Sequence, residues 1–150
     1  SVVFPSLVTG GIFAIQYNPL LNSIQVPLLV SVCFNIIGNN AITSLSFPSL
    51  TTFTYGSPVG LANCYVQSNT SLTSINLGNL INYSGGSISI NANNLPSAQV
   101  NYILGKLVSI VPSITGKAIT VTQIPEAPPT GQGLTDKATL LANGNVVFTD

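Results

Sequence analysis

Apolar and polar residues alternate along the first 95 positions, and the alternation restarts at a constant distance from a recurring asparagine. The residue three positions before each asparagine is apolar: Ile15 before Asn18, Ile36 before Asn39, Val66 before Asn69 and Ile88 before Asn91. The residue five positions before Asn18, Asn39 and Asn69 is Phe13, Phe34 and Cys64, respectively. Six positions after the first three asparagines stand Ile24, Leu45 and Ile75, followed two positions later by Val26, Phe47 and Leu77. A period of two is that of a half-buried strand, so the pattern predicts two strands in each unit and a core of these residues other than Cys64.

Each predicted unit closes at a residue that interrupts strand pairing. Pro5, Pro27 and Pro48 follow the last apolar residue of the second strand, and Gly78 occupies this place in the fourth unit. The asparagines at 18, 39, 69 and 91 are 21, 30 and 22 residues apart. Units of this length cannot bury an apolar face alone and must stack on one another. Because neither strand is followed by a helical pattern, residues 1–95 are predicted to form a right-handed parallel β-solenoid of about four coils.

The recurring asparagine has a structural interpretation. It stands where a strand ends and backbone groups turn away from their partners, and a buried side-chain amide can both donate to and accept from such groups. We therefore expect Asn18, Asn39, Asn69 and Asn91 to stack as a structural ladder rather than to form a ligand site.

The repeats resemble those of a known group of proteins. The segment FPSLVTGGIFAIQYNPLLNSIQVP is similar to the leucine-rich-like coils of receptor L domains and related bacterial surface proteins, which follow the form LxSVGGxLxIxxNxxLxSIxLPxL. The resemblance covers roughly residues 3–95. It implies a leucine-rich-like solenoid, an extracellular or cell- or virion-surface location, and an adhesive, architectural or receptor-binding role. The second coil departs from the pattern because it lacks the glycine pair seen at Gly10-Gly11 and Gly85-Gly86.

Residues 96–150 are predicted to form a C-terminal capping segment that makes one compact unit with the coils. The tail resembles the closing segment of such repeats in bacterial and phage surface or tail proteins. A helix is expected after Ser97 as N-cap, with Val100, Ile103, Leu104, Leu107 and Val108 on one face. A strand at 117–123, a Pro/Gly loop, a helix at about 134–143 ended by Gly144, and a final strand at 145–149 follow. Asp136 beside Lys137 is expected in a solvated first helical turn.

Composition narrows the function. Only 4% of the 150 residues are charged, and they comprise three lysines and three acids with no histidine. Three lysines cannot form the basic patch that nucleic acid requires. No acid precedes Glu126, and a serine or cysteine nucleophile would lack histidine, so we expect no catalytic residue, metal site or cofactor. Polar residues, glycine or proline interrupt every apolar run, so no membrane span is predicted.

Two cysteines fall in neighbouring predicted coils. Cys33 precedes Asn39 by six positions and Cys64 precedes Asn69 by five, so their Cα atoms are expected within disulfide range. The one-residue offset would aim the two side chains at opposite faces, although the insertion before Cys64 could relax it. Both a disulfide and two buried thiols stay open, and the pattern favours the thiols slightly.

Two surface features are candidates for binding or modification. The third coil is longer than its neighbours, so Tyr55, Pro58 and Leu61 are candidates for a protruding binding loop, although a loop folded back on the coil is the simpler expectation. Asn69 and Asn82 match the N-glycosylation sequon, which matters only in a secretory setting. Asn69 is assigned to the ladder, which leaves Asn82 as the better candidate.

The predicted function is that of a non-catalytic extracellular structural protein, a subunit of a self-assembling filament or surface layer. An adhesin or phage-tail receptor-binding module is the alternative, with a carbohydrate or surface receptor as its partner. Val2, Val3 and Phe4 form an apolar strand with no charged residue nearby, which is an edge that invites another chain. We expect homo-oligomers that stack end to end, unless residues upstream of Ser1 cover this edge.

Overall fold

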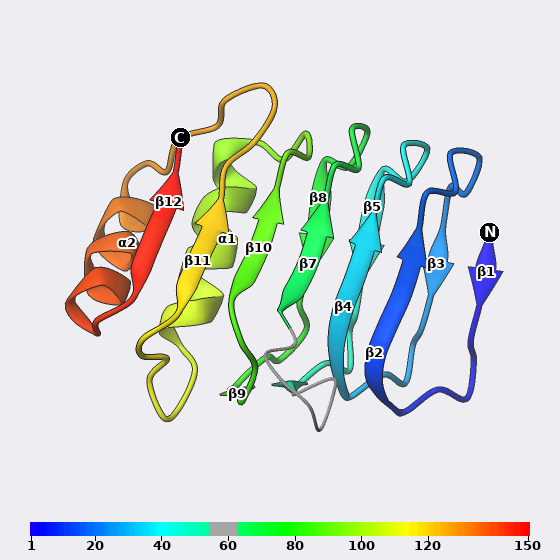
Figure 1. Cartoon of the computed structure of the whole chain (residues 1–150), viewed down its shortest axis with the longest axis horizontal. Coiled ribbons are helices and arrows are strands. Elements are labelled where there is room, and N and C mark those ends of the chain that lie inside the picture. The colour runs from blue at the N-terminus through cyan, green and yellow to red at the C-terminus, as the bar shows by residue number, and fades with distance from the viewer. Residues whose placement is uncertain (55–62) are drawn as a thin grey trace.

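An eight-stranded parallel sheet runs along the whole length of the molecule in the computed structural model (Figure 1). The structure describes residues 1–54 and 63–150. The strands that lie side by side in chain order are β2 (Thr9–Gln16), β4 (Ser31–Ile37), β7 (Cys64–Gln67), β10 (Ile88–Asn91), β11 (Ala118–Val121) and β12 (Val146–Thr149). The remaining two, β6 (Thr52–Phe53) and β9 (Asn82–Tyr83), continue the sheet from the first half of β4. The protein is therefore mainly β, as predicted, with a largely parallel main sheet.

A second layer lies behind the main sheet and changes from strands to helices along the chain (Figure 1). In its first part β1 (Val2–Val3) pairs with β3 (Ile24–Gln25), and β5 (Ser44–Ser46) pairs with β8 (Ser74–Asn76). In its second part α1 (Ser97–Val108) follows β10, and α2 (Gln132–Ala142) follows β11. The chain thus leaves each strand of the main sheet, passes through the back layer and returns to the next parallel strand, as parallel pairing requires.

The predicted core residues occupy the space between the two layers. All are buried except Ile15, which is half-buried and packs against the same core. Aromatic rings interlock there, with the Phe34 centroid 4.1 Å from that of Phe47 and 5.6 Å from that of Phe53. The period-two pattern therefore identified the inward faces of both layers correctly.

Residues 96–150 continue the main sheet, which differs from the predicted cap. β11 pairs with β10, and β12 pairs with β11, both in parallel. The predicted apolar face of α1 turns Val100, Ile103, Leu104 and Leu107 into the same core that the repeats form. The helices therefore take the place of back-layer strands behind the last strands of the sheet instead of lying across its end.

The helix termini agree only in part with the sequence-based expectations. α1 begins at Ser97 itself and its N-cap is Pro96, with no side-chain cap hydrogen bond, so the predicted Ser97 cap is wrong. Gly144 follows the C-cap of α2 with φ 80°, and its N–H donates to the Leu141 carbonyl, as expected for a glycine at this position.

Candidate functional site

A line of side-chain amides joins the carboxyl ends of the main-sheet strands, and we call it the amide ladder. Each rung accepts at Oδ1 from the backbone N–H of the preceding rung, namely Asn18 to Asn39 (3.1 Å), Asn39 to Asn69 (3.0 Å) and Asn69 to Asn93 (3.0 Å). Each Nδ2 donates to a carbonyl of the preceding unit, namely Asn39 to Ile15 (2.8 Å), Asn69 to Ile36 (3.1 Å) and Asn93 to Val66 (2.8 Å). The ladder therefore ties each unit to the next, as predicted for Asn18, Asn39 and Asn69.

The fourth rung is Asn93, so the assignment of Asn91 is wrong. Asn91 ends β10 opposite Gln67, and its Oδ1 accepts a hydrogen bond from Ser89 Oγ (3.0 Å). The sequence spacing misled because the glycine pair Gly85-Gly86 lengthens the turn between β9 and β10. The Tyr83 hydroxyl donates to the Gly86 carbonyl and closes this turn. The added residues shift the next rung along the chain.

The residue before each of the first four rungs has a left-handed backbone. Its φ is 55° at Tyr17, 66° at Gly38, 55° at Ser68 and 53° at Ala92. Residues other than glycine reach this region at a cost, and they keep it only where surrounding bonds hold the backbone. The ladder hydrogen bonds one residue later supply such bonds, which is why a side chain as large as Tyr17 is found there.

The N-terminal end of the ladder and of the core is exposed. Asn18 is exposed, whereas Asn39 and Asn69 are fully buried. A hollow of about 450 Å³ lies beside Asn18, and side chains of the first unit line it, among them Phe4, Ile15 and Leu21. In the second unit the equivalent side chains, among them Val26 and Ile36, are buried, and the first unit lies against them. The hollow is therefore the open end of the core.

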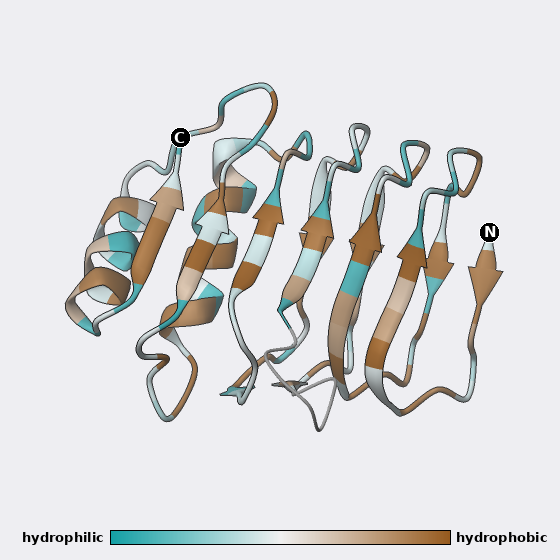
Figure 2. Ribbon diagram, viewed as in Figure 1, coloured by the Kyte–Doolittle hydropathy of each residue, from teal (hydrophilic) through white to brown (hydrophobic). Residues whose placement is uncertain are grey.

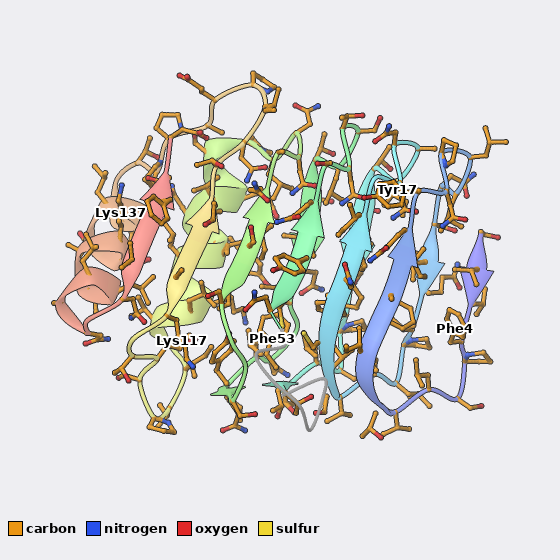
Figure 3. The ribbon with its side chains drawn as sticks, in the orientation of Figure 1. Phe4, Tyr17, Phe53, Lys117 and Lys137 are labelled. Atoms are coloured by element: carbon orange, nitrogen blue, oxygen red, sulfur yellow. The ribbon has the colours of Figure 1, made fainter. Side chains whose placement is uncertain are left out.

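Apolar side chains surround this end of the molecule. Leu20 is 90% exposed and Tyr17 is 73% exposed, and Val3 and Ile12 are half-exposed. Figure 3 shows Phe4 at the N-terminal end of the back layer and Tyr17 at the carboxyl end of β2. The predicted assembly edge is paired on one side, because the Val2 N–H donates to the Ser23 carbonyl in the pairing of β1 with β3.

Backbone groups also point outward at both ends of the main sheet. The Tyr17 N–H points toward β4, since it donates to the Ile37 carbonyl (2.8 Å). Because these groups alternate along a parallel strand, the N–H groups of Ala14 and Gln16 point away from β4. Likewise the Val146 N–H points toward β11, since it donates to the Lys117 carbonyl. The backbone N–H and carbonyl groups of Val147 and Thr149 therefore point away from β11. Within residues 1–54 and 63–150, no strand pairs with the outer edge of β2 or of β12.

The C-terminal end of the molecule presents a helix flank beside β12. Gly133, Asp136 and Leu140 are the buried side of α2. Leu134 and Leu141 are seven residues apart, so they share one flank of the helix, and both are about half-exposed. Val146 and Phe148 of β12 are also half-exposed. Figure 2 shows β1 and β12, the strands at the two ends, largely in the hydrophobic colour.

The two cysteines lie together in the core. The Cys64 thiol donates to the Cys33 sulfur, with the two Sγ atoms 3.1 Å apart, and Cys33 donates to the Asn63 carbonyl (3.2 Å). The hydrogen bond that Cys64 donates, together with burial, raises the pKa of Cys64 well above its usual range. The same hydrogen bond lowers the pKa of Cys33, while burial opposes that effect. The two thiols therefore form a hydrogen-bonded pair in the core.

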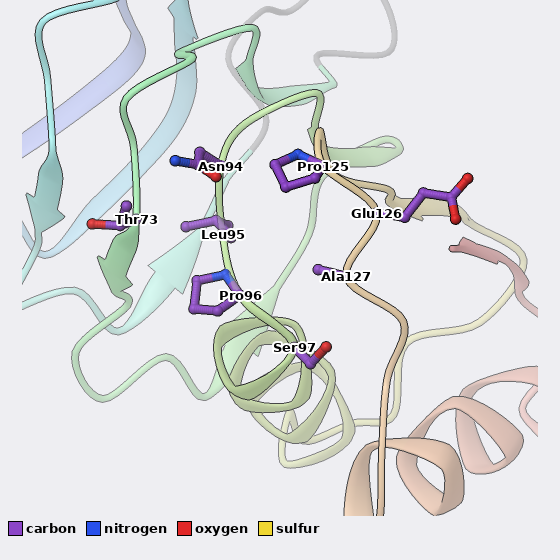
Figure 4. A pocket seen from close by; sticks show the side chains of 8 residues that line it. All are labelled: Thr73, Asn94, Leu95, Pro96, Ser97, Pro125, Glu126 and Ala127. Carbon is purple, nitrogen blue, oxygen red and sulfur yellow. The ribbon is translucent and has the colours of Figure 1, made fainter.

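A surface pocket of about 440 Å³ lies where the strand part of the back layer meets α1 (Figure 4). It is lined by Thr73, Asn94, Leu95, Pro96, Ser97, Pro125, Glu126 and Ala127. Glu126 is exposed, and Figure 4 shows its carboxylate pointing away from the other labelled side chains. Glu126 carries the one titratable side chain among these lining residues. The pocket is therefore lined mainly by apolar and neutral polar side chains.

The second acid of the C-terminal segment is placed differently from its predicted position. Asp136 is buried between the helices rather than solvated, and its Oδ1 accepts from Gln132 Nε2 (2.9 Å). A Cβ at Gly105 of α1 would lie 3.2 Å from its Oδ2, so the glycine leaves room for this carboxylate. The expectation failed because Asp136 lies on the side of α2 that is buried, together with Gly133 and Leu140, and a position near the start of a helix does not decide which side packs inward.

The structure describes the two predicted glycosylation sites but not the predicted binding loop. Tyr55, Pro58 and Leu61 lie in residues 55–62, outside the described residues. Asn69 is fully buried, and its amide donates to Ile36 and Gln67 in the ladder, so a glycan cannot reach it in the folded protein. Asn82 is exposed on β9.

In the part of the chain that the structure describes, no helix is long and apolar enough to cross a membrane. Over the same residues, no three or more His, Cys, Asp or Glu side chains come together as metal ligands would. Searches of protein-family models, curated proteins and solved structures found no match for the chain. The ladder and the two ends of the sheet are therefore the features that bear on function.

Proposed function

We propose that this chain is a non-catalytic structural protein of an extracellular or cell-surface assembly, in which copies stack end to end as right-handed, leucine-rich-like β-solenoids. The observation that carries the proposal is that the main sheet has an outer strand edge without a partner at each end, among the described residues, and that β2 and β12 run in the same direction. Two such edges are complementary, so β12 of one copy can pair with β2 of the next.

The strand register inside the molecule supports one alignment for this contact. Ile15 pairs with Ile36, which pairs with Val66, and the same row continues to Thr149. Continuing it into a second copy places Ile15 opposite Thr149. The outward N–H groups of Ala14 and Gln16 then meet the outward carbonyls of β12. The side chain of Asn18 would donate to the Thr149 carbonyl of the neighbouring copy, as Asn39 donates to Ile15 within one copy.

The side chains at the two ends support the same contact. The hollow beside Phe4 and Ile15 is apolar and open, and the flank of α2 carries Leu134 and Leu141 half-exposed. Burying such side chains removes apolar surface from water at roughly 25 cal/mol per Å². Placing the helix flank of one copy against the open core of the next therefore adds apolar burial to the strand pairing.

No charged side chain of the N-terminal end opposes the contact. The net charge is zero, and the first charged residue of the chain is Lys106. Native sheet edges are commonly protected by lysine or by inward-pointing charges, and β1 and β2 contain neither. The N-terminal end therefore lacks the usual barrier to association.

Light scattering and electron microscopy over a range of concentrations test the proposal. The parent chain is expected to form linear oligomers whose mean mass rises with concentration. Ala14→Pro removes one outward N–H of β2, leaves the bonds between β2 and β4 intact, and is expected to reduce the mean mass to that of a monomer. Ala14→Ser is the matched control, because it also changes the side chain but keeps the N–H, and it should assemble like the parent.

Circular dichroism of each variant separates loss of assembly from loss of fold. A folded parent that stays monomeric at every concentration would contradict end-to-end stacking and favour a lone binding module. Oligomers that persist in folded Ala14→Pro would show that the β2 edge is not the contact.

A further inference from the structure

We propose that Cys33 and Cys64 form a disulfide that joins β4 to β7 when the chain folds in an oxidising compartment. The inference is independent of end-to-end assembly, because it concerns a bond inside one copy. It assigns a modification site at a place where the sequence favoured two thiols.

The backbone positions the two residues for such a bond. Asn35 pairs with Tyr65, so Cys64 lies opposite Phe34 and Cys33 is one residue away on the neighbouring strand. Strands about 4.8 Å apart with a step of about 3.3 Å along the strand place the two Cα atoms about 6 Å apart. Disulfides most often join Cα atoms at about this separation. The Sγ atoms are already 3.1 Å apart, closer than ordinary sulfur contact, so only a small side-chain rotation completes the bond.

A local break in strand alternation explains why the offset does not separate the side chains. The consecutive residues Val32, Cys33 and Phe34 of β4 are all buried, although a regular strand would expose the middle one. Cys33 therefore points into the protein and reaches Cys64. The sequence pattern assumes strict alternation, and this is the assumption that fails at β4.

The chemistry needs a two-electron oxidant, such as glutathione disulfide. The thiolate of one cysteine attacks one sulfur of the oxidant, which forms a mixed disulfide and releases one glutathione thiolate. The other cysteine then loses its proton and attacks the protein sulfur of the mixed disulfide, which forms the protein disulfide and releases the second thiolate. Two protein thiols are oxidised, and one glutathione disulfide is reduced to two glutathiones.

Burial decides when the reaction takes place. Cys33 is 1% exposed and Cys64 is 4% exposed, so a bulky oxidant cannot reach them in the folded protein. The bond should therefore form during folding, before the core closes, and should form slowly in protein that is already folded. This order of rates distinguishes a structural bond from a reversible surface switch.

The experiment refolds the full chain from denaturant with glutathione disulfide and glutathione, or with a reductant alone. Each sample is then denatured, treated with iodoacetamide and weighed by mass spectrometry. Oxidatively refolded protein is expected to take up no label and to weigh about 2 Da less than reduced, unlabelled protein, for the loss of two hydrogens. Reduced protein should take up two labels, and oxidation should raise the thermal midpoint by about 10 °C.

Cys33→Ala and Cys64→Ala are the control variants, because alanine keeps the site apolar and leaves one thiol. Each has one thiol, which ends with one label or one bound glutathione, so neither variant should show the loss of two hydrogens or a rise in midpoint on oxidation. Two labels on oxidatively refolded parent, or a parent linked only between chains on a non-reducing gel, would overturn the proposal. The mass measurement on the parent decides the question even if a variant fails to fold.

Discussion

The amide ladder makes its sharpest prediction at Asn39. Replacing Asn39 with alanine removes the acceptor of the Asn18 N–H (3.1 Å) and the donor to the Ile15 carbonyl (2.8 Å). It also removes the donor to the Ile37 carbonyl (3.2 Å). The side chain is fully buried, so water does not replace these bonds without disturbing the packing around them. Leaving buried polar groups without partners costs about 1–3 kcal/mol each, with partly exposed groups at the low end.

The expected loss of unfolding free energy depends on which hydrogen bonds the partners of Asn39 keep after the substitution. The Ile15 carbonyl lies on the side of β2 that faces β4, so it keeps a backbone partner and loses only its second hydrogen bond. The Asn18 N–H is part-buried and loses the partner described above. We therefore expect Asn39→Ala to lower the free energy of unfolding by about 2–3 kcal/mol. With an m-value of about 2 kcal/mol per molar urea, this corresponds to a fall of about 1 M in the urea midpoint.

Asn18→Ala provides a matched comparison with the same chemical change. Asn18 is exposed, and its Nδ2 donates to Gln16 (2.8 Å) at the surface, so its loss should cost less than about 1 kcal/mol. Urea unfolding of both variants, followed by circular dichroism at a concentration where the protein is monomeric, measures the difference. Equal midpoints for the two variants, or an Asn39→Ala midpoint equal to that of the parent, would refute the ladder argument.

Two further predictions concern turns and helix packing away from the ladder. Gly78→Ala should destabilise the protein by about 3 kcal/mol, because the φ of Gly78 is 56° and the new Cβ would lie 2.4 Å from the Phe47 carbonyl oxygen. Gly116→Ala is the control, because its Cβ meets no atom within 4 Å, and it should cost about 1 kcal/mol. Thermal unfolding of the two variants measures the difference. Leu104→Ala removes a fully buried side chain from α1 and should cost about 2–5 kcal/mol, whereas Leu134→Ala at the half-exposed flank of α2 should cost less than about 1 kcal/mol in urea unfolding.

The strand units could be predicted because their period of two is repeated around a fixed residue. Phe34, Leu45 and Leu77 were assigned to the core from their offset to an asparagine, and all three are almost completely buried. The helices were also recognisable, since the spacing of Ile103 and Leu107 is that of one helix face. Repetition and periodicity are local properties of the sequence, and they determine which face of each element turns inward.

The position of each element along the stack was harder to predict. Turn lengths between units differ, and the glycine pair at Gly85-Gly86 displaced the predicted rung from Asn93 to Asn91. The role of residues 96–150 was misjudged because a strand pattern does not state which strand it pairs with. Ile119 could not be placed opposite Ile88 from periodicity alone, although their pairing is what continues the main sheet.

The transition from back strands to helices has a visible effect on the ladder. An α-helix is about 10 Å across with its side chains, whereas parallel strands are about 4.8 Å apart, so the back layer must spread where α1 and α2 replace strands. At this point Gln123 replaces asparagine as the rung and reaches the Ile90 carbonyl (2.8 Å) with its longer side chain. Its buried Oε1 has no hydrogen-bond partner among the described residues. Its backbone N–H turns to Asp150 Oδ2 (2.8 Å) rather than to an amide. Because the strand-backed units keep complete amide rungs and the helix-backed units do not, the N-terminal end is the better template for adding another unit.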